Sequence, residues 1–334
     1  MARTAYVVQR GATVRREGAL LNVFVGSKRE AQISTHDLGQ LVLMGNVLLT
    51  PGALDLLLER GVDTVLLTVH GRYRARIVGT GSGHVTLRLA QYAAFSEPSR
   101  ALEVAKALVR GKVENQRRYL VRQAREGRAA GCRRACLSMR ATLERLARAE
   151  TLDEVRGCEG AAAAAYFRVF GGLITAEGFS FDGRNRRPPM DPVNAMLSFS
   201  YTLLANVVEA AVHVVGLDPY LGTLHAPEPG RPSLVCDLQE EFRTPLVDAM
   251  VVAAMNLGVV EPGDFEQGAA GEPVWMKREA VRSLVQLFER RLARAVRYEP
   301  VGKRLPYRMV VEQQVRRMAR AVLEGEPYEA FKPR

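Results

Sequence analysis

The sequence predicts an α+β protein in which a small N-terminal β-domain, resembling a β-sandwich with one helix, precedes a larger all-α domain. The length of 334 residues suits two domains at roughly 100 to 200 residues each. Up to about residue 90, apolar residues alternate or occur in short runs between turn residues, which is typical of strands. From residue 98 the apolar period becomes 3.6, so we expect domains at 1–92 and 93–334.

The N-terminal pattern predicts strands at 6–9, 20–25, 31–34, 41–44, 62–69, 72–78 and 85–89. Glycine-containing turns at 10–11, 17–18, 45–46 and 70–71 separate them. One helix interrupts the strands, with Thr50 as N-cap, Pro51 at its first position and Gly61 after its end.

The second domain is predicted to hold helices at 98–127, 130–148, 151–170, 192–215, 237–257, 277–296 and 306–324. Asp191-Pro192 and Asp218-Pro219 each pair an N-cap acid with a proline at the first helical position. Gly216 is expected to end the helix 192–215.

The composition is that of an ordinary globular protein, with 47% apolar and 25% charged residues, which excludes disordered and collagen-like chains. Four cysteines without a C-x-x-C pair indicate a reduced, cytoplasmic protein, and the first residues lack the apolar run of a signal peptide. Polar residues such as Asn206, Glu209 and Asp248 interrupt the most apolar stretches, 199–217 and 246–260. These stretches therefore favour buried core helices over membrane spans.

The formal charge of +11 is concentrated in two segments. Residues 100–150 carry 14 Lys and Arg against five Asp and Glu, and residues 277–334 carry 15 against seven, so the remainder is mildly acidic. Arg far outnumbers Lys, and its planar fork suits phosphate oxygens. The distribution favours a nucleic-acid-binding surface over the alternative of merely solvated helix faces.

Two single residues are candidates for chemistry. Glu159 precedes a glycine and five alanines, on a helix that another helix could approach closely, where a carboxylate would be partly desolvated. An exposed Glu at the start of an Ala-rich helix is the ordinary alternative. His225 lies at a loop edge with acids shortly downstream, and it suits either a first-row metal ligand or a surface residue.

An acidic turn follows at Asp237, Glu240 and Glu241, whose i, i+3 and i, i+4 spacing puts the three carboxylates on one helical face. A divalent cation would relieve their repulsion, although a cap at Ser233 or Asp237 with a pair between Glu240 and Arg243 is the structural alternative. Pro245 frees the carbonyl of Glu241, so we expect a bend.

A histidine with carboxylates fits Mg²⁺ or Mn²⁺ with open positions better than a closed zinc site. The sequence contains no H-E-x-x-H motif, no P-loop and no dinucleotide-binding glycine motif between a strand and a helix.

Four motifs in order carry a family resemblance: E-G-A-x-A-x-x-Y-F from Glu159, then segments 187–204, 216–225 and 233–248. The segment G-N-V-L-L-T-P from Gly45 and the K-x-x-N-Q motif of Lys112, Asn115 and Gln116 add to it. The chain resembles the CRISPR-associated spacer integrases, the larger of the two nucleases of the adaptation module.

The resemblance implies that Glu159, His225 and Glu240 are metal ligands and that Asp237 is an acidic catalytic neighbour. The family uses Asp or Glu at the third ligand, and helix phase alone does not separate Glu240 from Glu241. It further implies that the β-domain forms a homodimer, and that the dimers assemble on a small ferredoxin-fold partner that spans the foreign DNA fragment.

The implied reaction is an in-line transesterification in which a 3′-hydroxyl of foreign DNA attacks a phosphate at the border of a CRISPR repeat, with Mg²⁺ or Mn²⁺ stabilising charge. Double-stranded and branched DNA are the expected substrates. A non-catalytic DNA-binding scaffold is the alternative, and a helical metalloenzyme for small molecules leaves the two Arg-rich segments unexplained. Residues expected to contact DNA are Lys112, Arg184, Arg186, Arg187 and Arg243.

Overall fold

The computed structural model describes residues 3–69, 71, 73–77, 79, 84–125, 131–185, 188–267 and 272–333. The chain divides into two compact units, Met1–Gly83 and His84–Arg334, so the division falls earlier than the expected residue 92. The strand expected at 85–89 is wrong, because these residues begin helix α2 (Val85–Ser96). The alternation there is short, and Leu87, Gln91 and Ala94 continue it as one buried helical face.

The first unit contains two four-stranded sheets and one helix, which confirms the expected small β-domain. Its core combines residues of both sheets and of the helix α1 (Pro51–Glu59), among them Val14, Leu41 and Leu56. One sheet has the order β1 (Arg3–Val7), β5 (Leu38–Met44), β7 (Asp63–Leu67), β8 (Tyr73–Ile77), and the other has β4 (Lys28–Ser34), β3 (Leu20–Val25), β2 (Ala12–Glu17), β6 (Leu48–Leu49).

Strand β2 was not expected, because its last three residues are charged and exposed and the apolar alternation ends after Val14. The predicted turns at Gly11 and Gly18 delimit this strand, with φ of 71° and 59°. Such backbone angles favour glycine, so the sequence predicted the two turns although it did not predict the strand between them.

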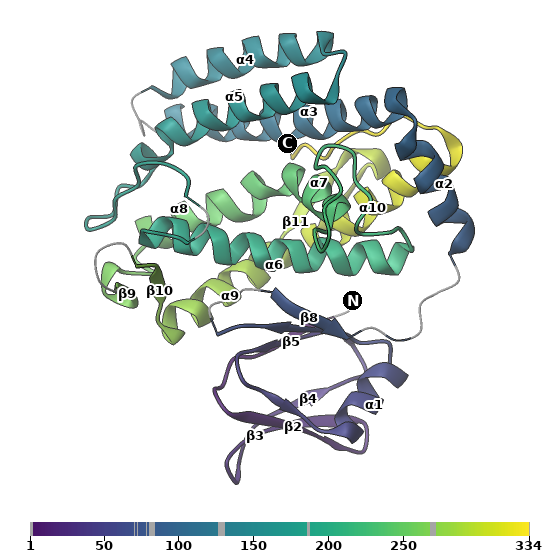
Figure 1. The fold of residues 1–334 in the computed structure, drawn as a ribbon. Coiled ribbons are helices and arrows are strands. Elements are labelled where there is room, and N and C mark those ends of the chain that lie inside the picture. Colours follow the sequence, from purple (N-terminus) through teal and green to yellow (C-terminus); the bar gives the residue numbers. More distant parts are fainter. Residues whose placement is uncertain are drawn as a thin grey trace. The chain divides into compact units, whose positions relative to one another are not determined.

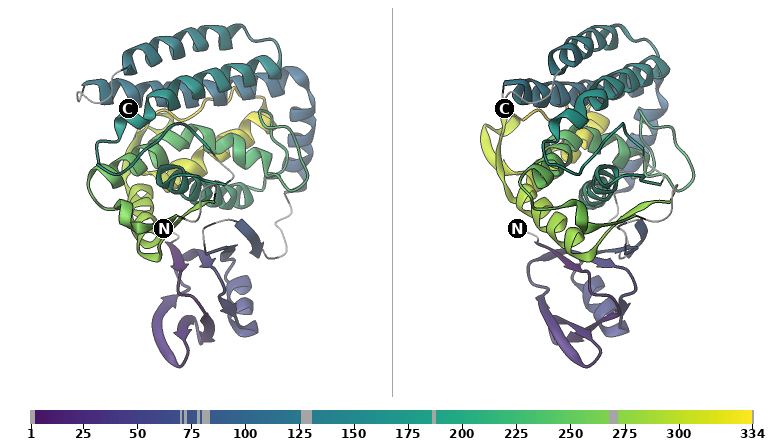
Figure 2. Two further views of the ribbon diagram at one scale, coloured as in Figure 1. Left: turned by 60° about the vertical axis from the view of Figure 1, so that its left-hand side comes forward. Right: turned by 90° about the vertical axis from the view of Figure 1, so that its left-hand side faces the viewer.

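The second unit contains all the other helices expected from the 3.6-residue period. Helices α3, α4 and α5 pack against one another, with α4 above α3 and α5 in Figures 1 and 2. The helices are α3 (Pro98–Arg125), α4 (Cys132–Arg148), α5 (Leu152–Phe170), α6 (Pro192–Val215), α7 (Ser233–Phe242), α8 (Ala249–Asn256), α9 (Arg278–Ala293) and α10 (Tyr307–Glu324), with 3₁₀ turns η1 (Gly171–Leu173), η3 (Pro262–Asp264) and η4 (Glu299–Val301).

Two short antiparallel pairs depart from the expected all-α content of this unit. Strand β9 (Phe265–Gln267) pairs with β10 (Val274–Met276), and β11 (Ala295–Tyr298) pairs with β12 (Lys303–Pro306). Strands of three or four residues are too short to give a period in the sequence. Most of this unit is nevertheless helical, so the α+β fold class is confirmed.

Helix α6 is the central core helix. Its N-cap Asp191 accepts a hydrogen bond from the Asn194 N–H at 2.8 Å, and Gly216 ends it at φ 97°, both as expected. It is long and apolar enough to cross a membrane, but 72% of its most apolar window is buried inside the protein. The helix start expected at Asp218-Pro219 is wrong, because Asp218 caps a turn by accepting from the Tyr220 N–H at 2.8 Å.

Between α7 and α8 the chain forms a π-helical segment, η2 (Arg243–Asp248), around Pro245. The carbonyl of Glu241, freed by the proline, accepts a hydrogen bond from Asn115 Nδ2 at 2.8 Å. Arg291 donates from Nε and Nη2 to the Pro245 carbonyl at 2.9 and 2.7 Å. Other side chains therefore satisfy the backbone at this expected irregularity, a feature frequent at functional sites.

Candidate active site

Two carboxylates from distant parts of the sequence meet at one ammonium group. Glu159 on α5 and Glu240 on α7 both contact Lys112 of α3, Glu159 through Oε1 and Glu240 through Oε2, with Nζ 2.6 Å from the latter. Lys112 is 4% exposed and Glu240 is 2% exposed. Oε2 of Glu240 is itself buried and faces the Lys112 ammonium.

Glu240 is kept ionised by its two cationic neighbours. Burial by itself would raise the pKa of its carboxyl, but Arg243 and Lys112 outweigh burial and lower the pKa to about 2. Arg243 Nη1 lies 2.9 Å from Glu240 Oε1. The pair between Glu240 and Arg243 that the sequence left as an alternative is therefore present together with the contact to Lys112.

His225 is held by Asp237. Its Nδ1 lies 2.7 Å from Asp237 Oδ1, which leaves Nε2 as the nitrogen that Asp237 does not engage. Asp237 is fully buried and also accepts the backbone N–H groups of Thr223, Leu224 and His225 at 2.6, 3.0 and 3.0 Å. Asp237 thus fixes both the loop and the ring, the arrangement by which a carboxylate orients a metal-binding imidazole.

His225 is close enough to Glu240 to contribute to the lowered pKa of that carboxyl. In the part of the chain that the structure describes, no three His, Cys, Asp or Glu side chains stand together as a ready metal-binding group. The cation between Glu159 and Glu240 is Lys112. The structure therefore brings the two glutamates together around a cation, and His225 acts on one of them, Glu240, through its charge.

The carboxylate of Glu241 points away from this centre. The structure therefore distinguishes Glu241 from Glu240, which helix phase alone could not do. Its carboxylate accepts from Tyr328 Oη at 2.8 Å, from Gln314 Nε2 at 3.1 Å and from the Phe331 N–H. Burial raises its pKa to about 7 against the effect of these donors. The expectation that three carboxylates share one face is wrong, because Glu241 binds the C-terminal segment.

A buried polar group behind the centre was not expected from the sequence. Asp248 accepts hydrogen bonds from Tyr166 Oη at 2.9 Å, Tyr201 Oη at 2.5 Å and Thr244 Oγ1 at 3.0 Å. Arg243 stacks on the Tyr201 ring, 4.9 Å from its centroid. In the sequence, Asp248 stands out only because it interrupts an apolar run, and the sequence does not identify its hydrogen-bond partners.

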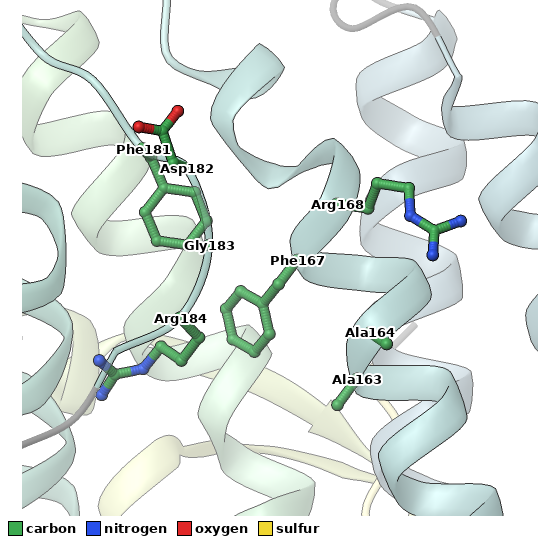
Figure 3. Close-up of a pocket in the computed structure, with 8 residues that line it drawn as sticks. All are labelled: Ala163, Ala164, Phe167, Arg168, Phe181, Asp182, Gly183 and Arg184. Carbon is green, nitrogen blue, oxygen red and sulfur yellow. The ribbon is translucent and has the colours of Figure 1, made fainter.

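A pocket of about 650 Å³ opens beside the centre, between α5 and the segment 181–184 (Figure 3). Phe167 points from α5 toward this segment, whereas Arg168 points away on another side of the helix. A smaller cavity of about 20 Å³ shares Ala163, Phe167 and Arg184 with the pocket and is also lined by Lys112 and Arg243. The pocket therefore adjoins a cavity lined by Lys112 and Arg243, the two cations that pair with Glu240.

The five residues expected to contact DNA fall into three groups. Lys112 and Arg243 pair with Glu240. Arg184 lines the pocket and donates to Asn194 Oδ1 and Ser198 Oγ at 2.6 and 3.0 Å. Arg186 and Arg187 lie outside the described residues.

The model of the family "CRISPR associated protein Cas1" matches residues 5–290. The chain belongs to this family. A CRISPR-associated endonuclease Cas1 of Rhodospirillum rubrum is 36% identical over 330 residues, covering 96% of this chain and 95% of the relative. One of Thermus thermophilus is 36% identical over 98% of this chain and 96% of its own length. The recognition made from the four motifs is confirmed.

Solved structures of Cas1 proteins and of a related enzyme have the same fold. A casposase bound to integration product matches with a TM-score of 0.85 at 25% identity, over 99% of this chain and 93% of that one. A Cas1 protein from Thermotoga maritima matches with a TM-score of 0.83 at 21% identity, over 99% of this chain and 100% of that one. The Cas1 family, as its curated members are named, consists of CRISPR-associated endonucleases.

Proposed function

We propose that this Cas1 protein is a metal-dependent DNA integrase and nuclease that joins the 3′-hydroxyl of a foreign DNA fragment to a CRISPR repeat by transesterification. The observation that carries the proposal is the meeting of Glu159 and Glu240 at one cation, with His225 oriented by Asp237 and near enough to Glu240 to affect its pKa. The casposase relative, whose structure is bound to an integration product, supports the reaction class.

The residues at this centre fit Mg²⁺ or Mn²⁺. Two carboxylates and one imidazole form an oxygen-rich set that leaves positions for water or phosphate oxygens. The buried Oε2 of Glu240 is already paired with a cation, the Lys112 ammonium at 2.6 Å, as expected of an oxygen that a metal could bind. Glu159, His225 and Glu240 would hold the ion, which when bound would neutralise charge on the attacked phosphate.

The protein's own residues then supply order and charge. Asp237 fixes the His225 ring through Nδ1, so Nε2 presents a lone pair in a set orientation. Arg243 keeps Glu240 anionic, as the lowered pKa of the Glu240 carboxyl indicates. Arg184 lines the adjoining pocket, which would receive the DNA strand that carries the reacting end.

The two basic segments differ in their suitability for binding DNA. On α4, several arginines are exposed and have no ion-pair partner among the described residues: Arg133, Arg134, Arg145 and Arg148. In the C-terminal segment, five arginines pair with nearby glutamates: Arg297, Arg308, Arg316, Arg317 and Arg320. The C-terminal segment also has exposed arginines without an ion-pair partner among the described residues: Arg278, Arg282, Arg290 and Arg294. We assign the main phosphate-binding surface to α4, where four such arginines lie on one helix.

The assembly part of the proposal comes from the family. A solved complex named Cas6-RT-Cas1–Cas2 has a chain of the same fold, with a TM-score of 0.85 at 22% identity over 99% of this chain and 36% of that one. We propose that the β-domain forms a homodimer and that the dimers bind a small ferredoxin-fold second adaptation protein.

The test is a strand-transfer and nicking assay on branched DNA with and without Mn²⁺ or Mg²⁺. Glu159→Ala, His225→Ala and Glu240→Ala should abolish activity and retain DNA binding. Glu326→Ala, which removes a 53% exposed side chain outside the proposed DNA-binding surface, is the matched control and should behave as wild type. Full activity in any of the three variants would refute that ligand, and salt-sensitive binding without metal-dependent turnover would favour the non-catalytic scaffold instead.

A further inference from the structure

Lys112 is an unusual residue to find buried at this centre. Its side chain is 5% exposed, and its ammonium contacts one oxygen of Glu159 and one of Glu240. Burial of an ammonium is costly unless it is paired with carboxylates, and burial of two carboxylates side by side is costly without a cation. The three groups therefore stabilise one another.

We propose that the Lys112 ammonium is an internal cation which Mg²⁺ or Mn²⁺ must displace in order to bind. The inference rests on the proposed function, because it assumes that Glu159 and Glu240 hold the metal. A metal bound by Glu159 Oε1 and Glu240 Oε2 would use the two oxygens that Lys112 occupies. Like charges at contact distance in a buried site repel strongly, so the ammonium and the metal exclude each other there.

The structure offers a second position for the displaced ammonium. Lys112 lines the cavity of about 20 Å³ together with Gln116, Asp248, Arg184 and Arg243, and this volume suits a group the size of one water molecule. The Asp248 carboxylate, together with the pairing of Arg243 with Glu240, offsets the two guanidinium charges at this cavity. Gln116 lies one turn further along α3, on the same face as Lys112. It is 2% exposed, and its Oε1 is a buried acceptor without a hydrogen-bond donor among the described residues.

Lys112 thus has two sets of partners: the carboxylates Glu159 and Glu240 without metal, and Gln116 Oε1 with Asp248 beside it once metal has entered. Because the metal and the ammonium compete for the same two glutamates, the measured metal affinity is lowered by the free energy needed to displace the ammonium. It also delivers a positive charge to the cavity that adjoins the proposed DNA pocket.

The first experiment compares Mn²⁺ binding by wild type, Lys112→Met and Lys106→Met, measured by electron paramagnetic resonance without DNA. Methionine retains the unbranched stem but removes the competing charge, so Lys112→Met should bind Mn²⁺ at least roughly tenfold more tightly. Lys106, on the same helix and paired only with Glu103, is the matched control and should leave the affinity unchanged. Unchanged or weaker binding by a folded Lys112→Met would overturn the proposal.

The second experiment uses the wild-type chain and so does not depend on how the variant folds. Side-chain NMR of wild type with saturating Mg²⁺ should show a new nuclear Overhauser contact between the Lys112 ammonium end and the Gln116 side chain. The signals of Lys28, whose side chain is 77% exposed, should be the same in both states. Saturation with Mg²⁺ that leaves the Lys112 contacts unchanged would contradict the exchange.

Failure of the proposed function would be distinguishable. In that case Mn²⁺ binding would be insensitive to Glu159→Ala and Glu240→Ala in the wild-type background. If those variants abolish binding while Lys112→Met fails to strengthen it, only the exchange is refuted.

Discussion

Gly222→Ala is expected to disrupt the loop that carries His225. A Cβ on Gly222 would lie 2.6 Å from Asp237 Oδ2, 2.7 Å from the Ser233 carbonyl carbon and 2.9 Å from the Leu234 nitrogen. Two of these atoms are backbone, so no rotation of a side chain relieves the clash, and the loop must move away from α7. Because the Thr223 and Leu224 N–H groups donate to the buried Asp237, that movement weakens charge-assisted hydrogen bonds.

The loss of one such bond costs about 2 kcal/mol, and the strain of overpacking costs about 1 to 3 kcal/mol. We therefore expect the free energy of unfolding, measured by urea titration, to fall by about 3 kcal/mol. Strand transfer should fall roughly 10- to 100-fold, since Asp237 would orient His225 less well. The control Gly160→Ala has no heavy atom within 4 Å of its new Cβ and should stabilise α5 by up to about 1 kcal/mol. Equal stability of the two variants would refute the reasoning.

The remaining predictions concern a buried acid and the basic surface. Because the folded pKa of Glu241 is raised to about 7, wild type loses stability as pH rises from about 4.5 through about 7, whereas Glu241→Gln does not. The stability of the variant relative to wild type should thus increase by about 3 kcal/mol between about pH 4 and about pH 8, and a pH-independent difference would contradict the assignment. Glutamine replacement of the four exposed α4 arginines should reduce the salt dependence of DNA binding by about 0.9 for each phosphate that the variant no longer neutralises. The control replaces four paired arginines of the C-terminal segment with glutamine: Arg297, Arg308, Arg316 and Arg320. This control should change the salt dependence of DNA binding little, and equal effects of the two replacements would refute the choice of α4.

Much of the fold could be predicted from the sequence, because helix caps and turns depend on residues that are neighbours in the chain. The N-cap Asp191 and the terminal Gly216 bound α6 at the expected residues, since both act through the backbone of their own helix. The same reasoning failed at Asp218-Pro219, where Asp218 caps a turn and also accepts from Tyr92 Oη at 3.0 Å. An N-cap motif and an Asx turn have the same local sequence, so only the fold distinguishes them.

The sequence predicted which residues form the candidate site, but it did not predict which residues they contact. Motif order identified Glu159, His225 and Glu240, yet separating Glu240 from Glu241 required the C-terminal segment, which binds Glu241 through Phe331 and Tyr328. That contact spans some ninety residues of sequence, and no helix period can report it. For the same reason Lys112 was expected to contact DNA, whereas the structure pairs it with the two glutamates.

A crystal structure of the protein with Mn²⁺, located by its anomalous scattering, tests the central claim most directly. The account predicts one ion bound by Glu159, His225 Nε2 and Glu240, with the Lys112 ammonium moved toward Gln116. An ion at another position, or Lys112 still lying between the two carboxylates at full Mn²⁺ occupancy, would contradict it.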